Sequence, residues 1–191
     1  MSKKDPPHRA FASAVAWEKW LAANQEDELG IWMKIGKKGS GVKSVDYQQA
    51  LRVALCYGWI DGQKLKCDEV YFLQRFTPRR RRSLWSQRNV KLVEELTKAG
   101  RMQARGQLEI DRAKADGRWE AAYASSASIE APEEFQRALQ DCPAAAAFYA
   151  SLTKTKRYSF LFRIVTAKRE ETRQRWIRRA VAMLEKGETF P

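Results

Sequence analysis

"WIDGQKLKCDEVYFLQRF", residues 59–76, is the stretch that decides the fold. Its two ends are rich in aromatic and β-branched or other apolar residues, which favour strands, and Asp61-Gly62 is a pair that favours tight turns. The pattern predicts two paired strands, "WID" and "EVYFLQRF", with "DGQKLKCDE" as their connection. Because side chains alternate along a strand, the second strand has two different faces. One face carries Val70, Phe72, Gln74 and Phe76, and the other carries Tyr71, Leu73 and Arg75.

Upstream of these strands, the hydrophobic pattern predicts two helices and one more strand. Apolar residues recur at helical spacing in residues 11–21 and 47–55, whereas those in residues 31–35 alternate as in a half-buried strand. We expect Ser44 to cap the second helix and Gly58 to end it.

Downstream, the chain becomes helical. A helix is expected from a cap at Ser86 to a stop at Gly100, and another is expected to end at Gly117. The polar stretch "SSASIEA" is the best linker candidate, and apolar residues at helical spacing continue after it. The sequence therefore predicts an α+β protein with two parts. Residues 1–124 would hold a small antiparallel sheet with flanking helices, and residues 125–191 would form an all-helical subdomain packed on the first.

Composition limits the possible functions. The 191-residue chain is 44% hydrophobic, which is enough for a core, and has a net charge of +13, which favours anionic partners. It has one histidine and three cysteines without metal spacing, so we expect no metal site and no cofactor. Neither a secretory signal nor a membrane span is apparent. Reduced thiols in a cytoplasmic protein are the simplest interpretation.

The basic stretch "RFTPRRRRSLWSQRN", residues 75–89, holds six arginines and no acid. If a helix begins at Ser86, its free N–H groups lie beside Arg75, Arg79 and Arg88, and such a helix start can take a phosphate or a carboxylate. The alternative is structural, with Ser86 as a simple cap and Asn89 as support for the first turn. Both interpretations stay open at the level of sequence.

Two further features belong to the same region. Arg75 lies on an expected strand, where a free charge is costly to bury, and Asp61 is its nearest candidate partner if the two strands pair. The pair could be purely structural, or it could lie in a cleft with Asp61 orienting the arginine or acting as a base. Trp59 and Trp85 flank this polar set, and each could stack on a ligand or belong to the core.

A second basic region lies in the C-terminal helices, where ten lysines and arginines occur between residues 154 and 179. Such a surface can attract polyanions without sequence specificity, or it can be a solvated face. The glycine-rich "KKGSG" lacks the spacing of a phosphate-binding loop and is best interpreted as a solvated loop.

Four segments carry a family resemblance. They are "KKGSGVKSVDYQQALRVALCYGWIDGQ", "RFTPRRRRSLWSQRN", "KAGRMQARGQLEIDRAKADGRW" and "SFLFRIVTAKREETRQRWIRRAVAMLEKG". Together they resemble the YdeI/OmpD-associated family of bacterial proteins, over about Trp17 to Gly187. The matching motif positions are Cys56, Gly58, Trp59, Asp61, Gly62, Arg75, Phe76, Pro78, Arg79, Ser83, Trp85, Ser86 and Asn89. The resemblance implies a small α+β fold and a link to bacteriocin protection or to an outer-membrane porin, and it supplies no catalytic residues.

Our leading hypothesis is a binding protein for a small anionic ligand. Its site would combine seven residues: Trp59, Asp61, Arg75, Arg79, Trp85, Ser86 and Asn89. The alternative is a non-specific nucleic-acid-binding protein that uses the basic stretch and the C-terminal helices. An enzyme with Asp61 as acid or base is a third hypothesis, which we do not favour because no second catalytic carboxylate stands at diagnostic spacing. Oligomeric state is left open.

Overall fold

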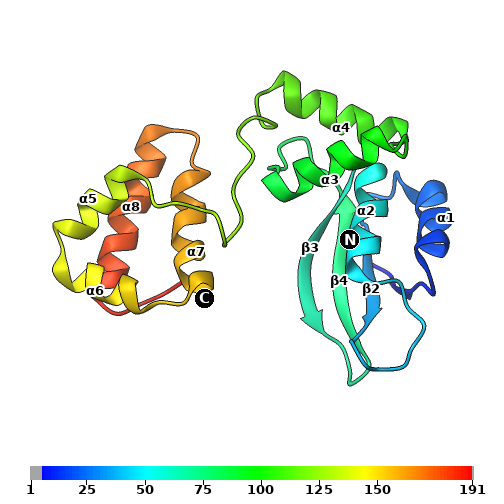
Figure 1. Ribbon diagram of the computed structural model, residues 1–191, viewed down its shortest axis with the longest axis horizontal. Coiled ribbons are helices and arrows are strands. Elements are labelled where there is room, and N and C mark those ends of the chain that lie inside the picture. Colours follow the sequence, from blue (N-terminus) through cyan, green and yellow to red (C-terminus); the bar gives the residue numbers. More distant parts are fainter. Residues whose placement is uncertain (1–5, 191) are drawn as a thin grey trace, which may run out of the picture. The chain divides into compact units, whose positions relative to one another are not determined.

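The computed structural model describes residues 6–190 and confirms the α+β class, with a sheet in the N-terminal half and helices alone in the C-terminal part (Figure 1). The chain forms two compact units. The first contains residues up to 85 together with 89–121, and the second contains residues 86–88 and those from 122 onward.

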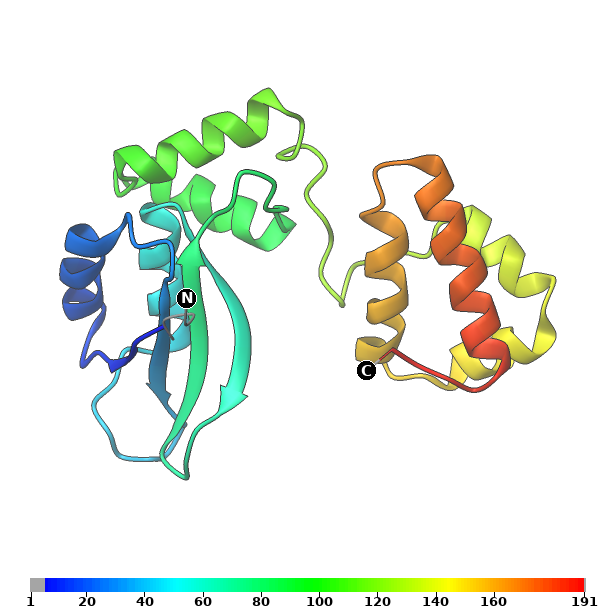
Figure 2. The ribbon, with the colours of Figure 1, turned by 180° about the vertical axis from the view of Figure 1, so that it is seen from behind.

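The sheet of the first unit has four strands in the order β1-β2-β4-β3. Their bounds are β1 His8–Ala10, β2 Ile31–Gly36, β3 Trp59–Lys66 and β4 Tyr71–Pro78. The β3–β4 and β2–β4 pairs are antiparallel, and β3 and β4 form the long hairpin seen in Figure 2. The sequence pattern did not predict β1, a three-residue strand that pairs in parallel with β2.

The predicted faces of β4 are confirmed by its register with β2. Phe76 pairs with Ile31 and Gln74 with Met33, and all four side chains are buried. The predicted turn at Asp61-Gly62 is wrong, because β3 continues through it to Lys66. The register shifts between Asp61 and Lys64, and the amide of Gln74 donates to the carbonyl of Gly62 at 2.9 Å. This side-chain bond satisfies a carbonyl that the irregular pairing leaves outside the regular ladder.

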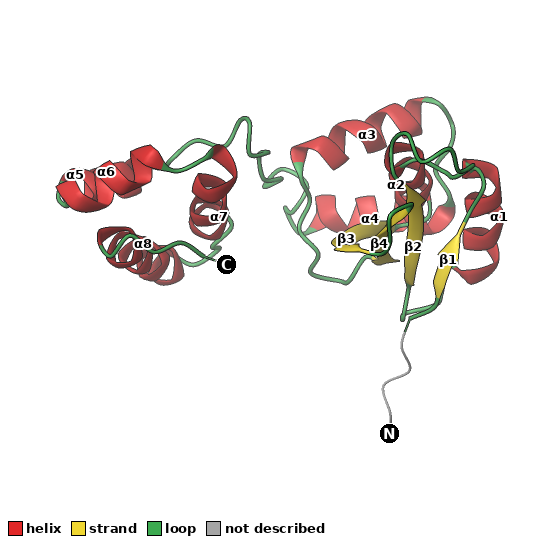
Figure 3. Ribbon diagram, turned by 90° about the horizontal axis from the view of Figure 1, so that it is seen from below, coloured by secondary structure: helices red, strands yellow, loops and turns green. Residues whose placement is uncertain are grey.

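Four helices complete the first unit or border it. They are α1 Ala14–Asn24, α2 Tyr47–Cys56, α3 Gln87–Lys98 and α4 Ala104–Ala115. In Figure 3, α2 and α3 lie on one side of the sheet. The register places Ile31, Met33 and Phe76 on one face of the sheet, and all three are completely buried. Trp17 of α1 joins this core and is completely buried.

The start of α2 differs from the prediction. Its N-cap is Asp46, whose carboxylate accepts from the N–H of Gln49 at 2.8 Å in a complete capping box. Ser44 instead accepts from the N–H of Gly36 at the end of β2, at 3.1 Å. Asp46 lies directly before the first helical residue, where its side chain can reach the free N–H groups. Gly58 follows the end of this helix with φ +70°, as its predicted role requires.

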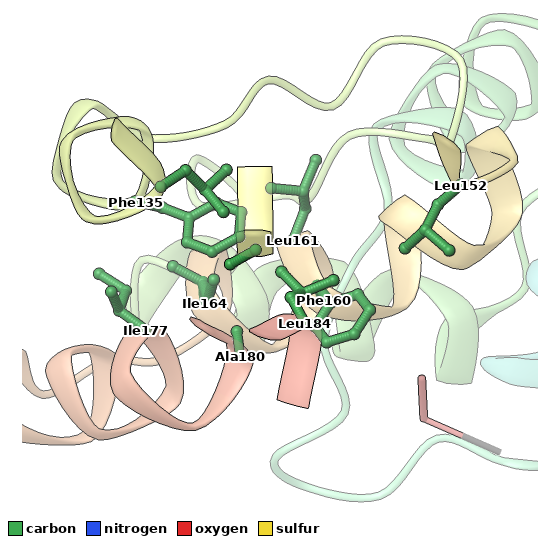
Figure 4. Packing of buried hydrophobic residues seen from close by; sticks show 10 residues of the cluster. Phe135, Leu152, Phe160, Leu161, Ile164, Ile177, Ala180 and Leu184 are labelled. Atoms are coloured by element: carbon green, nitrogen blue, oxygen red, sulfur yellow. The ribbon is translucent and has the colours of Figure 1, made fainter. Parts of the chain in front are cut away.

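The second unit contains four helices, α5 Glu133–Gln140, α6 Pro143–Ser151, α7 Lys154–Val165 and α8 Glu170–Glu185. Figure 4 shows how side chains from these helices converge on one core. Phe135, Phe160, Ile164 and Leu184 are completely buried there. The amphipathic pattern of the sequence is thus resolved into four short helices, each of which supplies part of a common interior.

Candidate functional site

The seven predicted site residues occupy different surroundings, beginning with those on β3. Trp59 is completely buried, and its indole N–H donates to the carbonyl of Gln25 at 2.9 Å. Asp61 accepts a hydrogen bond from the hydroxyl of Tyr47 on α2 at 2.7 Å. Trp59 is therefore a core residue, and the carboxylate of Asp61 connects β3 with α2.

Arg75 lies on the opposite face of the sheet from Asp61. The register pairs Asp61 with Phe76, so the alternation of side chains directs the neighbouring Arg75 to the other side. Its guanidinium lies 5.5 Å from the ring centroid of Trp32 and donates to the carbonyl of Leu29. Burial lowers the pKa of Arg75, and the nearby charge of Asp27 opposes that shift. The expected Asp61–Arg75 ion pair does not form within the described residues.

Arg79 and Trp85 are brought together by the structure. The guanidinium of Arg79 lies 3.6 Å from the ring centroid of Trp85 and donates to the carbonyl of Leu84 at 3.1 Å. Trp85 in turn contacts Trp119, with the ring centroids 4.9 Å apart, and the ammonium of Lys114 lies 5.3 Å from the Trp119 ring. These four side chains form a continuous series of cations and indoles, and the contact between the two tilted rings holds the segment after β4 against the segment after α4.

Ser86 and Asn89 stand at the start of α3. This helix begins at Gln87, so Ser86 directly precedes it, as predicted. Ser86 also forms an isolated bridge with Tyr123, and the N–H of Gln87 donates to the carbonyl of Tyr123 at 2.9 Å. Asn89 is buried on the helix. An anion at this helix start would thus compete with the Tyr123 backbone for the first free N–H group.

A different cluster of arginines surrounds a cavity of about 480 Å³ in the first unit. The lining residues are Arg81, Arg112, Ala115, Asp116 and Arg118. Arg81 comes from the loop after β4, and the others come from the end of α4 and the residues that follow it. We call this cavity the arginine pocket. One arginine of the basic stretch, Arg81, therefore lines a defined cavity.

Arg118 is the most buried arginine of the arginine pocket. Only 4% of its side chain is exposed. Its Nε lies 2.7 Å from both carboxylate oxygens of Asp116, and its Nη1 donates to the carbonyl of Ser83 at 2.8 Å. The third nitrogen, Nη2, is buried and has no hydrogen-bond partner in the described part of the chain. A buried guanidinium with an unused donor is costly, because buried polar groups are normally hydrogen-bonded.

The loop that carries Arg81 is held by a tight turn. The N–H of Arg80 donates to the hydroxyl of Ser83 at 2.9 Å, and the N–H of Ser83 donates to the carbonyl of Arg80 at 2.8 Å. Arg112 pairs with Glu109 at 2.7 Å, and within residues 6–190 Arg81 has no carboxylate partner. With three cations and one acid lining the pocket, its walls carry a net positive charge.

Arg112 and Arg118 were not predicted as site residues. They lie 23 and 29 residues beyond the basic stretch, on a segment whose pattern indicated only a helix and its stop at Gly117. The available signal was the sequence "DGRW", residues 116–119, which places an arginine and an indole directly after a glycine that ends a helix. That glycine has φ +74°, which turns the chain so that Arg118 enters the interior.

The second predicted basic surface, on the C-terminal helices, is partly occupied by internal partners. Arg173 pairs with Glu170 and lies 3.5 Å from Glu134. Arg163 and Arg179 lie against the aromatic rings of Trp176 and Phe190, at centroid distances of 4.0 to 5.9 Å. Arg157 donates to the carbonyl of Tyr149 at 3.0 Å, near the end of α6. These contacts give the basic residues structural roles in the helical unit.

Comparison with known families divides the chain in a similar way. Residues 9–109 match a family described as a domain of unknown function (DUF8412). Residues 128–187 match the family described as bacteriocin-protection, YdeI or OmpD-associated. No curated protein and no solved structure matches the chain.

These matches confirm the predicted family resemblance and correct its extent. The YdeI/OmpD-associated match covers the helical part alone, whereas the motif positions between Cys56 and Asn89 fall within the other match. Because the match to the domain of unknown function spans more than half of the 191 residues, the protein belongs to the DUF8412 family, and its helical part is a YdeI/OmpD-associated, bacteriocin-protection domain.

Proposed function

We propose that this protein binds a small anion in the arginine pocket. The observation that supports the proposal most strongly is Arg118, a buried cation whose Nη2 lacks a hydrogen-bond partner in the described residues while the same side chain lines a cavity. An anionic oxygen that reached Nη2 would complete the hydrogen bonding of this guanidinium.

The size and charge of the arginine pocket fit such a ligand. Its volume of about 480 Å³ lies within the range typical of small-molecule sites. Arginine guanidinium groups bind phosphates and carboxylates through paired N–H donors, and Arg81 is the lining arginine without a carboxylate partner in the described chain. We therefore expect a ligand that carries one or more phosphate or carboxylate groups, and we expect Asp116 to disfavour ligands with a larger anionic cluster beside it.

Thermal unfolding in the presence of anions tests this proposal. Inorganic phosphate, pyrophosphate and citrate are added to the full chain at constant ionic strength, with sodium chloride as the reference. An anion that binds only the folded state raises the unfolding temperature in proportion to the logarithm of its concentration once the site is saturated. We expect at least one of the three to do so.

The loop supplies a matched pair of variants for this experiment. Arg81→Ala removes an arginine that lines the pocket, whereas Arg82→Ala removes an exposed arginine one residue further along that does not line it. We expect Arg81→Ala to lose most of the anion-dependent shift and Arg82→Ala to keep it. Equal shifts in both variants, or no shift beyond that of sodium chloride in the wild type, would contradict the proposal.

A cytoplasmic location is part of the same proposal. It is supported by the three cysteines, which are all free thiols. Within the described residues, none of the helices has the length and hydropathy needed to cross a bilayer. Fractionation of cells that express the chain with a small C-terminal tag would test the location, and recovery in the periplasm would contradict it.

The family description of the helical domain suggests a part in protection against bacteriocins, and we propose that any such part is indirect. With a net charge of +13, the protein repels cationic peptides at long range and is poorly suited to sequester them. Calorimetric titration with a cationic peptide such as polymyxin should therefore give no binding heat. Tight binding would contradict the indirect route while leaving the anion site untouched.

A further inference from the structure

The sheet of the first unit has a second face, opposite the one that α1 and α2 contact through Trp17 against Phe76 and through Tyr47 bonded to Asp61. In β2, Ile31, Met33 and Ile35 are buried against the helices, whereas Trp32 and Lys34 between them are only half-buried. In Figure 3, α2 and α3 lie on one side of the sheet. We call this second surface the open sheet face. Strands β1, β2 and β4 contribute the following side chains to it: His8, Ala10, Trp32, Lys34, Tyr71, Leu73, Arg75 and Thr77.

Aromatic rings and cations are paired across the strands of the open sheet face. Trp32 is directly opposite Arg75, and the guanidinium lies 5.5 Å from the indole centroid. The ammonium of Lys34 lies 6.0 Å from the ring of Tyr71. His8 on β1 meets the edge of the same indole at 6.4 Å. The strands thus hold two aromatic–cation pairs side by side on one surface.

The strand residues on this face carry charge of one sign, and Asp68, just before β4, accepts from the N–H of Tyr71 at 2.7 Å and lies near Lys34. The residues of β1, β2 and β4 that face this side include Lys34 and Arg75 and no carboxylate, and the nearest acid acting on Arg75 is Asp27 outside these strands. Leu73 is buried between its neighbours, so the centre of the surface is apolar and its surroundings are basic. A second copy of the same face would be repelled by this charge, and an anionic partner would be attracted.

We infer that the open sheet face binds single-stranded nucleic acid. Lys34 and Arg75 would contact phosphates, and the rings of Trp32 and Tyr71 would stack on unpaired bases, which is the way in which sheet surfaces with exposed aromatics take single strands. A duplex keeps its bases stacked inside, so it would gain only the phosphate contacts. This inference is independent of the arginine pocket, with which it shares no residue.

Fluorescence anisotropy with a labelled twelve-residue oligothymidylate tests the inference on the full chain. Trp32→Ala changes no charge, and we expect it to weaken binding by about tenfold because it removes one stacking platform. Trp32→Phe, which keeps an aromatic ring, should retain most of the affinity. A Trp32→Ala variant that binds as tightly as the wild type would overturn the inference.

A charge-matched comparison separates this site from general attraction to a basic protein. The double variant Lys34→Ala/Arg75→Ala removes two cations from the open sheet face, and Arg175→Ala/Arg178→Ala removes two exposed cations from α8. The first should lower the slope of log affinity against log salt by about 1.4, because each phosphate contact on a single strand contributes about 0.7. The second should leave the slope nearly unchanged, and equal effects of the two variants would overturn the inference.

Two competitors decide the class of ligand. Unlabelled single strands should displace the probe at lower concentration than a duplex of the same length. If polyglutamate competes as well as the single strand does, the face recognises charge alone, and the stacking role of Trp32 and Tyr71 is excluded. Arg81→Ala serves as a further control, because the loss of the arginine pocket should leave oligonucleotide binding within about twofold.

Discussion

The most buried arginines of the first unit differ from those of the second unit in how far they are withdrawn from solvent. In the first unit, Arg79 and Arg118 are buried, at 6% and 5% exposure, and Arg118 keeps a donor without a partner in the described residues. In the second unit, Arg163, Arg173 and Arg179 lie nearer the surface, where carboxylates and aromatic rings meet them. These arginines are thus buried in the interior of the first unit and bound by surface partners in the second.

This difference indicates where function is to be sought. A cation at the surface loses little hydration and needs little in return, so its ion pairs contribute little to stability or to specific binding. A buried cation gives up hydration that the fold must replace, and where the replacement is incomplete a ligand can supply the remainder. By this criterion, the arginine pocket is a stronger candidate site than the more numerous arginines of the helical unit.

The largest expected effect separates the cores of the two units. Phe160→Ala, in the second unit, removes a completely buried ring and should lower the free energy of unfolding by about 3 to 5 kcal/mol. Six of the seven tryptophans, Trp17, Trp20, Trp32, Trp59, Trp85 and Trp119, lie in the first unit. In urea titrations of this variant, part of the helical signal in far-ultraviolet circular dichroism should therefore be lost at lower urea than in the wild type. Most of the tryptophan fluorescence change should keep its wild-type midpoint.

Phe148 is the matched control for that change. It is only partly buried against the same core, so Phe148→Ala should destabilise the second unit less than Phe160→Ala does. If Phe160→Ala moved the fluorescence and dichroism transitions together by the same amount, the two units would unfold as one, and the comparison between them would lose its thermodynamic basis.

A smaller effect is expected when arginines of the two units are compared directly. Arg118→Ala removes the hydrogen bond to the carbonyl of Ser83 and the ion pair with the half-exposed carboxylate of Asp116, and should cost about 2 kcal/mol of unfolding free energy. Arg173→Ala breaks pairs that are more than one-third exposed, and should cost about 0.5 kcal/mol. Chemical denaturation measures both, and similar losses would show that burial does not distinguish the two arginines.

The smallest effect concerns pH and the cysteines of the two units. Burial raises the pKa of the Cys56 thiol in the first unit to about 11, whereas Cys142 in the second unit is only partly buried. Because the folded thiol holds its proton above the ordinary pKa of about 8.5, its contribution to stability is complete below that pH. It is then lost as the pH rises toward 11, at up to about 1.4 kcal/mol per pH unit.

Variants isolate this contribution from that of other alkaline groups. The difference in unfolding free energy between wild type and Cys56→Ala, measured by tryptophan fluorescence, should shrink between pH 8 and pH 10.5. A Cys56 difference that is independent of pH would show that the thiol is not shielded as its burial implies.

Much of the fold could be predicted from local patterns. The alternation of Leu73, Gln74 and Phe76 determined which side of β4 faces the core, because a strand has only two faces. The turn at Asp61-Gly62 could not be predicted correctly, because what continues β3 through it is the distant partner strand and the side chain of Gln74. Short-range turn preferences are thus overridden by pairing between strands.

The site was harder to predict than the fold, for a related reason. The basic stretch pointed to the right loop, and Arg79 and Trp85 do stack there. The sequence could not show that Arg112 and Arg118, from the far end of α4, line a cavity with Arg81 from that loop. Convergence of side chains from distant segments is a property of packing, and composition or spacing carries no direct record of it.

The central claim, that an anion completes the hydrogen bonding of Arg118, can be measured at that residue. In protein with ¹⁵N-labelled arginine, the Nε–H resonance of Arg118 is assigned by its absence from Arg118→Lys and followed during titration with the anion that most raises the unfolding temperature. We expect a saturable shift of this resonance, with the Arg82 resonance unchanged and the shift lost in Arg81→Ala. An Arg118 resonance that stays in place while the surface arginines shift together would contradict it.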